Sequence, residues 1–175
     1  PTSVKAERIR EETEYGGVRV TLQGKLGTAR GAMQVDVGFG DVVTPKPARN
    51  RYPVLLDATE PQLWMVPIET TIAEKFETMV TRGALNSRMK DFFDVWYLAH
   101  QREFDGQVLR DAVRRTFGHR ETPMEADMPL FTRGFATDQG MQRQWTAFVR
   151  RANADAPAHF ESVMEGIARL LGPIF

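Results

Sequence analysis

Two segments near the start of the chain alternate between apolar and polar positions. Apolar side chains take every second position in residues 18–22 and again in residues 33–39. A period of two residues is typical of a half-buried β-strand. The stretch between them, residues 24–31, contains three glycines and predicts a turn, so we expect the two strands to form an antiparallel hairpin.

Five prolines between residues 45 and 67 separate this hairpin from the rest of the chain. Proline removes a backbone donor and fixes φ, so we expect an irregular connection there, with a short strand at residues 52–56. We place the boundary between a strand-rich part, residues 1–66, and a helical part, residues 67–175, at the end of this connection.

After Pro67 the apolar residues recur at helical spacing. The predicted helices cover residues 68–80, 92–99, 108–117, 141–149 and 160–171, with glycines as stops after the first and the last, and residues 124–137 are expected to form a loop. The predicted fold class is α+β, a small antiparallel sheet followed by a helical bundle.

The composition is that of an ordinary globular protein with no net charge. The 175 residues include 23 Lys and Arg, 23 Asp and Glu, three His and no Cys. The charge balance argues against a histone-like nucleic-acid binder but allows a local basic face. The lack of cysteine excludes disulfides, zinc thiolate sites and thiol catalysis, and no apolar run is long enough to span a membrane. We expect a soluble, cytoplasmic protein that makes no membrane contact.

Asp36 is the first candidate functional residue. It lies in the middle of the second predicted strand, where aspartate is disfavoured, and the alternation points it away from the apolar face. It can be a carboxylate on a solvated sheet face, or a metal ligand or general base held on a rigid strand. Gly38 and Gly40 favour the second interpretation slightly, because they leave room for a ligand beside the backbone.

Charged residues concentrate in the segment 88–94, which contains Arg88, Lys90, Asp91 and Asp94. Asp91 and Asp94 share one helix face. Lys90 precedes Asp94 by four residues, the weaker orientation for an ion pair, so stability alone explains the arrangement poorly. Acidic residues also suit the first turn of a helix, and a carboxylate pair beside cations suits a site for phosphate and divalent metal.

Lys75 borders the apolar stripe of the helix predicted at residues 68–80. Its stem can be buried while its charge reaches a cleft, and the simpler interpretation is a lysine at the margin of the core.

A basic stretch lies further along, at Arg110, Arg114, Arg115, His119 and Arg120. Such a stretch is usually a solvated helix face, and its functional alternative is phosphate contact along an RNA or a triphosphate.

Three blocks of sequence resemble a known family: residues 34–41 (QVDVGFGD), 69–76 (ETTIAEKF) and 86–94 (NSRMKDFFD). Together they resemble the AbiEii/AbiGii toxin family of nucleotidyltransferases, with weaker similarity over nearly the whole chain. The resemblance implies a DNA-polymerase-β-like nucleotidyltransferase core followed by a helical domain. It also implies the toxin of a type IV toxin–antitoxin operon, often linked to phage defence, with a cognate antitoxin. Such toxins move a nucleotide from an NTP, with Mg²⁺, onto an acceptor that in some members is tRNA.

The same resemblance assigns roles to residues. Asp36 matches the family's strand carboxylate and would bind the metal, Lys75 matches a lysine that contacts the triphosphate, and Asp91 and Asp94 match candidate catalytic aspartates. The predicted catalytic residues are therefore Asp36, Lys75, Asp91 and Asp94, and the predicted substrate-binding residues are Lys75, Arg88 and Lys90. We expect all of them to line one cleft.

The sequence departs from the family at its first motif. Family members carry a Gly-Ser or Gly-Gly stretch followed by an Asp-x-Asp strand, and this sequence contains no Asp-x-Asp. Because two-metal transfer needs those carboxylates, we expect the chain, which begins without Met, to be the C-terminal portion of the enzyme and inactive alone.

Two further functional interpretations stay open, together with one consequence for assembly. The chain can be a catalytically incomplete module that binds nucleotide, RNA or an antitoxin. A metal nuclease of the Asp…Glu-x-Lys kind fits poorly, because Glu74 and Lys75 are adjacent. A sheet that lacks its covering elements is also expected to self-associate through residues 17–39.

Overall fold

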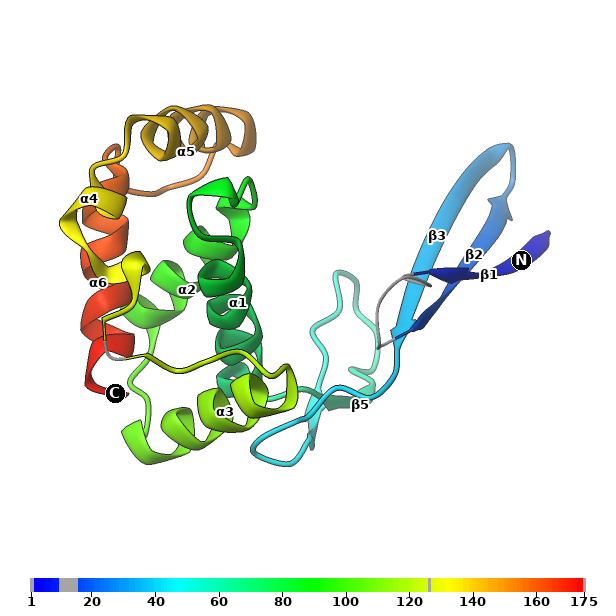
Figure 1. Cartoon of the computed structure of the whole chain (residues 1–175). Helices are drawn as coiled ribbons and strands as arrows, with labels where there is room; N and C mark the ends of the chain where they lie inside the picture. The colour runs from blue at the N-terminus through cyan, green and yellow to red at the C-terminus, as the bar shows by residue number, and fades with distance from the viewer. Residues whose placement is uncertain (1, 10–15, 126, 175) are drawn as a thin grey trace. The chain divides into compact units, whose positions relative to one another are not determined.

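The computed structural model describes residues 2–9, 16–125 and 127–174, and it divides into two compact units (Figure 1). The first unit is Pro1–Asp41 and the second is Val42–Phe175. Each unit is described by itself below. The α+β fold class is confirmed, since a small antiparallel sheet precedes a set of helices.

The first unit contains a three-stranded antiparallel sheet in the order β1–β2–β3, formed by Ser3–Ile9, Gly17–Leu26 and Ala29–Gly38. The predicted hairpin is confirmed, with Val20 opposite Val35. Its turn is tighter than predicted, because only two residues separate β2 from β3 and Gly27 supplies the left-handed conformation, with φ 60°. The first strand was not predicted, because its sequence SVKAERI mixes charges into the apolar alternation.

The second unit opens with a two-stranded antiparallel sheet, β4 (Ala48–Arg51) and β5 (Gln62–Met65). The strand predicted at residues 52–56 is wrong. Pro53 cannot donate a ladder hydrogen bond, and pairing instead uses the proline-free segments on either side. The amide of Tyr52 closes the connection by donating to the carbonyl of Pro61 at 2.9 Å.

The helices of the second unit follow the predicted stripes. They are α1 (Ile68–Arg82), α2 (Met89–Gln101), α3 (Gly106–His119), α4 (Arg133–Ala136), α5 (Gln139–Ala152) and α6 (Phe160–Leu171). Single 3₁₀ turns lie at Gly83–Leu85, Pro129–Phe131 and Gly172–Ile174. The loop predicted at residues 124–137 is therefore partly helical, because Pro129 begins the second 3₁₀ turn and the Thr132 hydroxyl caps α4.

Aromatic residues fill the core of the helical part. Helix α1 packs beside α3 and α2 beside α6, as the ribbon also shows (Figure 1). The rings of Phe76 and Phe117 lie 5.2 Å apart, as do those of Phe92 and Phe160, and all four are fully buried. This packing fixes the orientation of α1 and α2, the helices that carry most of the predicted site residues.

Within the described residues, no helix is both long and apolar enough to cross a membrane. The predicted division into a strand-rich part of the nucleotidyltransferase core, residues 1–66, and a helical domain, residues 67–175, stays a prediction. The two compact units of the structure meet at a different place, between residues 41 and 42.

Candidate functional site

The candidate site is a cluster of charged side chains between α1 and α2, which we call the α1–α2 cluster: Lys75, Arg88, Lys90, Asp91 and Asp94. Lys75 comes from the middle of α1, and the others lie at the start of α2. The start of α2 is fixed by Asn86, a fully buried side chain whose Oδ1 accepts a hydrogen bond from the Arg88 amide at 2.9 Å. The turn before the helix is therefore held by a buried anchor.

Lys75 joins the two aspartates across the helix interface. Its Nζ lies 2.6 Å from Oδ1 of Asp91 and 2.8 Å from Oδ2 of Asp94. The two aspartates lie on one face of α2, as their spacing predicts. The structure thus brings together the second and third sequence blocks that carry the family resemblance.

Two further cations surround the aspartates. Lys90 Nζ lies 2.6 Å from Asp94 Oδ2, and Arg88 Nε lies 2.8 Å from Asp91 Oδ2. The Arg88 contact is an ion pair by distance only, because Asp91 Oδ2 accepts no well-aligned hydrogen bond from the described residues. Three cations and two carboxylates give the α1–α2 cluster a net positive charge.

Burial differs sharply within the α1–α2 cluster. The Asp91 side chain is 4% exposed and that of Lys75 is 19% exposed, whereas those of Arg88 and Lys90 are 55% and 72% exposed. The cluster therefore has a fixed inner part and a solvent-facing rim of two cations.

The protonation state of Lys75 follows from these contacts. Burial by itself lowers the pKa of Lys75, but the hydrogen bonds and the charges of Asp91 and Asp94 outweigh it, so the net pKa is raised above its ordinary value. Lys75 is consequently a permanent ammonium at neutral pH. It can hold carboxylates or contact a phosphate with its third N–H, but it cannot act as a base or nucleophile there.

The α1–α2 cluster does not fit a Mg²⁺ site. Magnesium needs carboxylates whose negative charge is available to it, and here two cations lie 2.6–2.8 Å from each aspartate and oppose a further cation. Across the described residues 2–9, 16–125 and 127–174, no group of three or more His, Asp or Glu side chains is arranged to hold a metal ion. The net positive charge of the cluster suits contact with an anion better than coordination of a metal cation.

Asp36 lies in β3 of the first unit, whereas the α1–α2 cluster belongs to the second unit. Its two oxygens accept hydrogen bonds from Arg19 Nε and Nη2 at 2.8 and 2.9 Å, and Arg19 is its cross-strand neighbour on β2. This bidentate pair explains how an aspartate is tolerated in the middle of a strand. Its predicted role as metal ligand, and its convergence with the α1–α2 cluster, stay predictions.

A second buried charge network lies on the other side of α1. Glu77, which is buried, accepts hydrogen bonds from Thr81 Oγ1 at 2.6 Å, Thr122 Oγ1 at 2.8 Å and Arg120 Nη1 at 2.6 Å. It ties α1 to the end of α3. Glu77 was not predicted, although it lies four residues after Ala73 and three before Val80, which places it beside apolar positions of the same helix. Arg120, part of the predicted basic stretch, belongs to this network.

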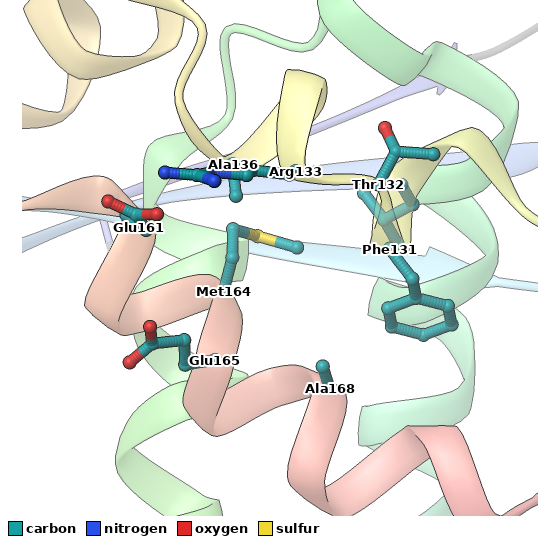
Figure 2. Close-up of a pocket in the computed structure, with 9 residues that line it drawn as sticks. Phe131, Thr132, Arg133, Ala136, Glu161, Met164, Glu165 and Ala168 are labelled. Carbon is teal, nitrogen blue, oxygen red and sulfur yellow. The ribbon is translucent and has the colours of Figure 1, made fainter.

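A separate pocket lies between α4 and α6 (Figure 2). Arg133, Glu161 and Glu165 border it, and Met164 faces into it. None of the residues that the sequence predicts for the site lines this pocket, so it is distinct from the α1–α2 cluster.

Comparison with known proteins gives the family. Residues 1–166 match the family described as nucleotidyl transferase AbiEii toxin, type IV TA system. Comparisons with curated proteins and with solved structures gave no match. The match covers both units and includes the α1–α2 cluster. Because it spans nearly the whole chain, the protein belongs to the AbiEii family of nucleotidyl transferase toxins of type IV toxin–antitoxin systems.

Proposed function

We propose that this protein transfers a nucleotide from an NTP to an RNA acceptor, such as tRNA, and that the α1–α2 cluster serves the nucleotide. The observation that carries the proposal is the Lys75 bridge. An ammonium from one helix holds two aspartates of another, at 2.6 and 2.8 Å, and so assembles two sequence blocks typical of the family into one site. The site would act in the cytoplasm, where NTPs and RNA are found, and the family context implies an antitoxin partner and a role in phage defence.

Each residue of the cluster has a separate role in this proposal. Arg88 and Lys90, at the exposed rim, contact the phosphates of the incoming NTP. Lys75 fixes the orientation of Asp91 and Asp94 and adds positive charge beneath those phosphates. Asp91 and Asp94 are the candidate catalytic residues, because they are the anionic groups held directly between Lys75 and the two rim cations.

The nucleotidyl transfer typical of the family uses a divalent metal, and the described carboxylates do not provide its site. A metal ion at Asp36 would bind a carboxylate that already accepts two hydrogen bonds from Arg19, and the charge of Arg19 would oppose a second cation there. We therefore propose that the 175-residue chain, which contains no Asp-x-Asp motif, transfers nucleotide negligibly without a version of that motif ahead of residue 1.

The test is an incubation with labelled NTPs, Mg²⁺ and total tRNA. The 175-residue chain is compared with a version extended upstream to include a Gly-Ser stretch and an Asp-x-Asp strand. We expect label on RNA only from the extended version. Strong Mg²⁺-dependent labelling by the 175-residue chain would contradict the inactivity, and labelling of no RNA by either version would contradict the proposed activity.

A second candidate function is binding without turnover. The neutralisation of Asp36, Asp91 and Asp94 by neighbouring cations favours it, because each of these carboxylates already has a cation beside it. The two candidates differ in one result. If the protein only binds, the extended version binds NTP or RNA but gives no labelled product, whereas an enzyme gives labelled RNA.

A further inference from the structure

The β4–β5 hairpin of the second unit presents one face that is cationic and aromatic. Arg49 pairs with Trp64 across the two strands, and Arg51 pairs with Gln62. Directly opposed residues, and residues two apart along a strand, project from the same face. The hairpin face is therefore formed by Arg49, Arg51, Gln62 and Trp64, which we call the Arg–Trp face.

The side chains of the Arg–Trp face are open to solvent. Trp64 is 70% exposed, which is unusual for the largest apolar side chain, and both arginines are exposed. Among the residues that the structure describes, neither arginine has a carboxylate partner within ion-pair distance. The eight strand residues, ARNR and QLWM, include no acid, so nothing on the strands offsets the positive charge.

The opposite face of the hairpin points elsewhere. Ala48, Asn50 and Met65 line a cavity together with Ile68 and Phe104, at the start of α1 and the loop before α3. Arg51 also borders this cavity, and Arg49 and Trp64 do not. The opposite face of the hairpin thus borders this cavity, whereas Arg49 and Trp64 of the Arg–Trp face are open to solvent and available to a partner.

We propose that the Arg–Trp face binds a single-stranded segment of the acceptor RNA, with one unpaired base stacked on Trp64 and the adjacent phosphates contacted by Arg49 and Arg51. Aromatic side chains beside unpaired cations are how proteins bind unpaired nucleotides, because every base has a π-face and every linkage a negative charge. Charge complementarity favours RNA over a protein partner, since the face carries two cations and no acid. The inference rests on the proposed function for the identity of its ligand, and it assigns the acceptor a surface separate from the α1–α2 cluster.

The test measures RNA binding without NTP or metal. The probe is a fluorescently labelled single-stranded RNA of about 12 nucleotides, within the site sizes of single-strand-binding modules, and the readout is anisotropy over a range of salt concentrations. We expect Trp64→Ala to weaken binding about 10-fold or more with little change in salt dependence, and Trp64→Phe to retain most of the affinity. Arg49→Gln and Arg51→Gln should each reduce the slope of log affinity against log salt by about 0.7, the value for one lost phosphate contact on a single strand.

Matched controls come from elsewhere in the same unit. Tyr97→Ala removes another exposed aromatic side chain, and Arg114→Gln removes an exposed arginine from the basic stretch of α3. Both should bind the RNA as the unaltered chain does. Base-paired RNA should bind more weakly than single-stranded RNA, because its bases are not available to Trp64.

Three results would overturn the inference. They are no binding of single-stranded RNA by the unaltered chain, binding that Trp64→Ala leaves unchanged, and a larger loss from Arg114→Gln than from either hairpin arginine. If the hairpin binds an acidic protein and no RNA, the first of these results is obtained and the inference is wrong. Trp64-dependent RNA binding without nucleotide transfer would keep this inference and contradict the proposed function, whereas transfer without Trp64-dependent binding would do the reverse.

Discussion

Lys75 determines the electrostatic state of the α1–α2 cluster. Without its ammonium, Asp91 would be a nearly buried carboxylate facing a second carboxylate, Asp94, with only the two exposed cations to balance them. A buried charge that loses its partner is far more costly than an exposed one. Any role of Lys75 in catalysis is therefore superimposed on a role in stability, and the two must be separated by experiment.

The stability role gives the first prediction. Lys75→Met keeps the length of the side chain and removes its charge, and it should lower the free energy of unfolding by roughly 3 kcal/mol. Lys90→Met, the matched control at the exposed rim, should cost about 0–1 kcal/mol. Urea unfolding at neutral pH measures both. Adding Asp91→Asn to Lys75→Met should recover part of the loss, and equal effects of the two lysines would contradict the account.

Glu77 gives a prediction about pH. Burial by itself raises the pKa of Glu77, but hydrogen bonds from Thr81, Arg120 and Thr122 and the charge of Arg120 outweigh it, so the pKa is lowered in the folded state. A carboxyl group with a lowered folded pKa stabilises the fold above its unfolded pKa, about 4.3, and loses that contribution as the pH falls further.

We therefore expect Glu77→Gln to be clearly less stable than the unaltered chain at pH 7. The difference in free energy of unfolding should shrink as the pH is lowered from about 5 through the folded pKa. Denaturant unfolding at a series of pH values provides the measurement. A difference that stays constant down to pH 3 would show that the hydrogen bonds to Glu77 do not depend on its charge.

At the scale of elements, the three-stranded sheet of the first unit has one apolar face. The registers place Val20 opposite Val35 and Leu22 opposite Met33, so these side chains project from the same side. Every residue of β3 is exposed, and Met33 is 62% exposed. Exposed apolar strands of this length are a template for association.

This element gives a prediction of self-association through residues 17–39. Sedimentation velocity should show the weight-average mass rising with protein concentration, and Val35→Lys should suppress the rise. Gln34→Lys adds the same charge to the other face of β3 and should have a smaller effect. A monomer at every concentration, or equal effects of the two lysines, would contradict the prediction.

How far the elements could be read from the sequence depended on the kind of pattern. Helices with apolar stripes, such as the one from residue 160 to 171, were predicted nearly to the residue, because burial against other helices imposes the period. The charged strand β1 was not predicted. The strand expected at residues 52–56 does not form, and the segments before and after those residues pair as β4 and β5. In both cases the pairing depends on a partner strand that the local pattern does not reveal.

The candidate site was predictable in its residue types and only partly in its geometry. Lys75 and Asp91 were singled out from helix faces and from the family resemblance, and their contact follows from the packing of two predicted helices. The bidentate Arg19–Asp36 pair and the Arg–Trp face were not predicted, because each depends on cross-strand register. Single exposed residues such as Trp64 carry no periodic signal at all.

At the scale of the whole molecule, the central claim is that the α1–α2 cluster serves nucleotide transfer. The most direct measurement is the rate of labelled nucleotide incorporation into tRNA by the extended version carrying Asp91→Ala or Lys75→Ala, assayed where denaturant unfolding shows both variants folded. Arg151→Ala, on the exposed end of α5, serves as the control.

We predict a loss of roughly 10²-fold or more for each cluster variant, the scale seen when one preorganised electrostatic group is removed, and an unchanged rate for the control. Incorporation at the unaltered rate by folded Asp91→Ala and Lys75→Ala variants would contradict the claim and leave the cluster as an anchor between two helices.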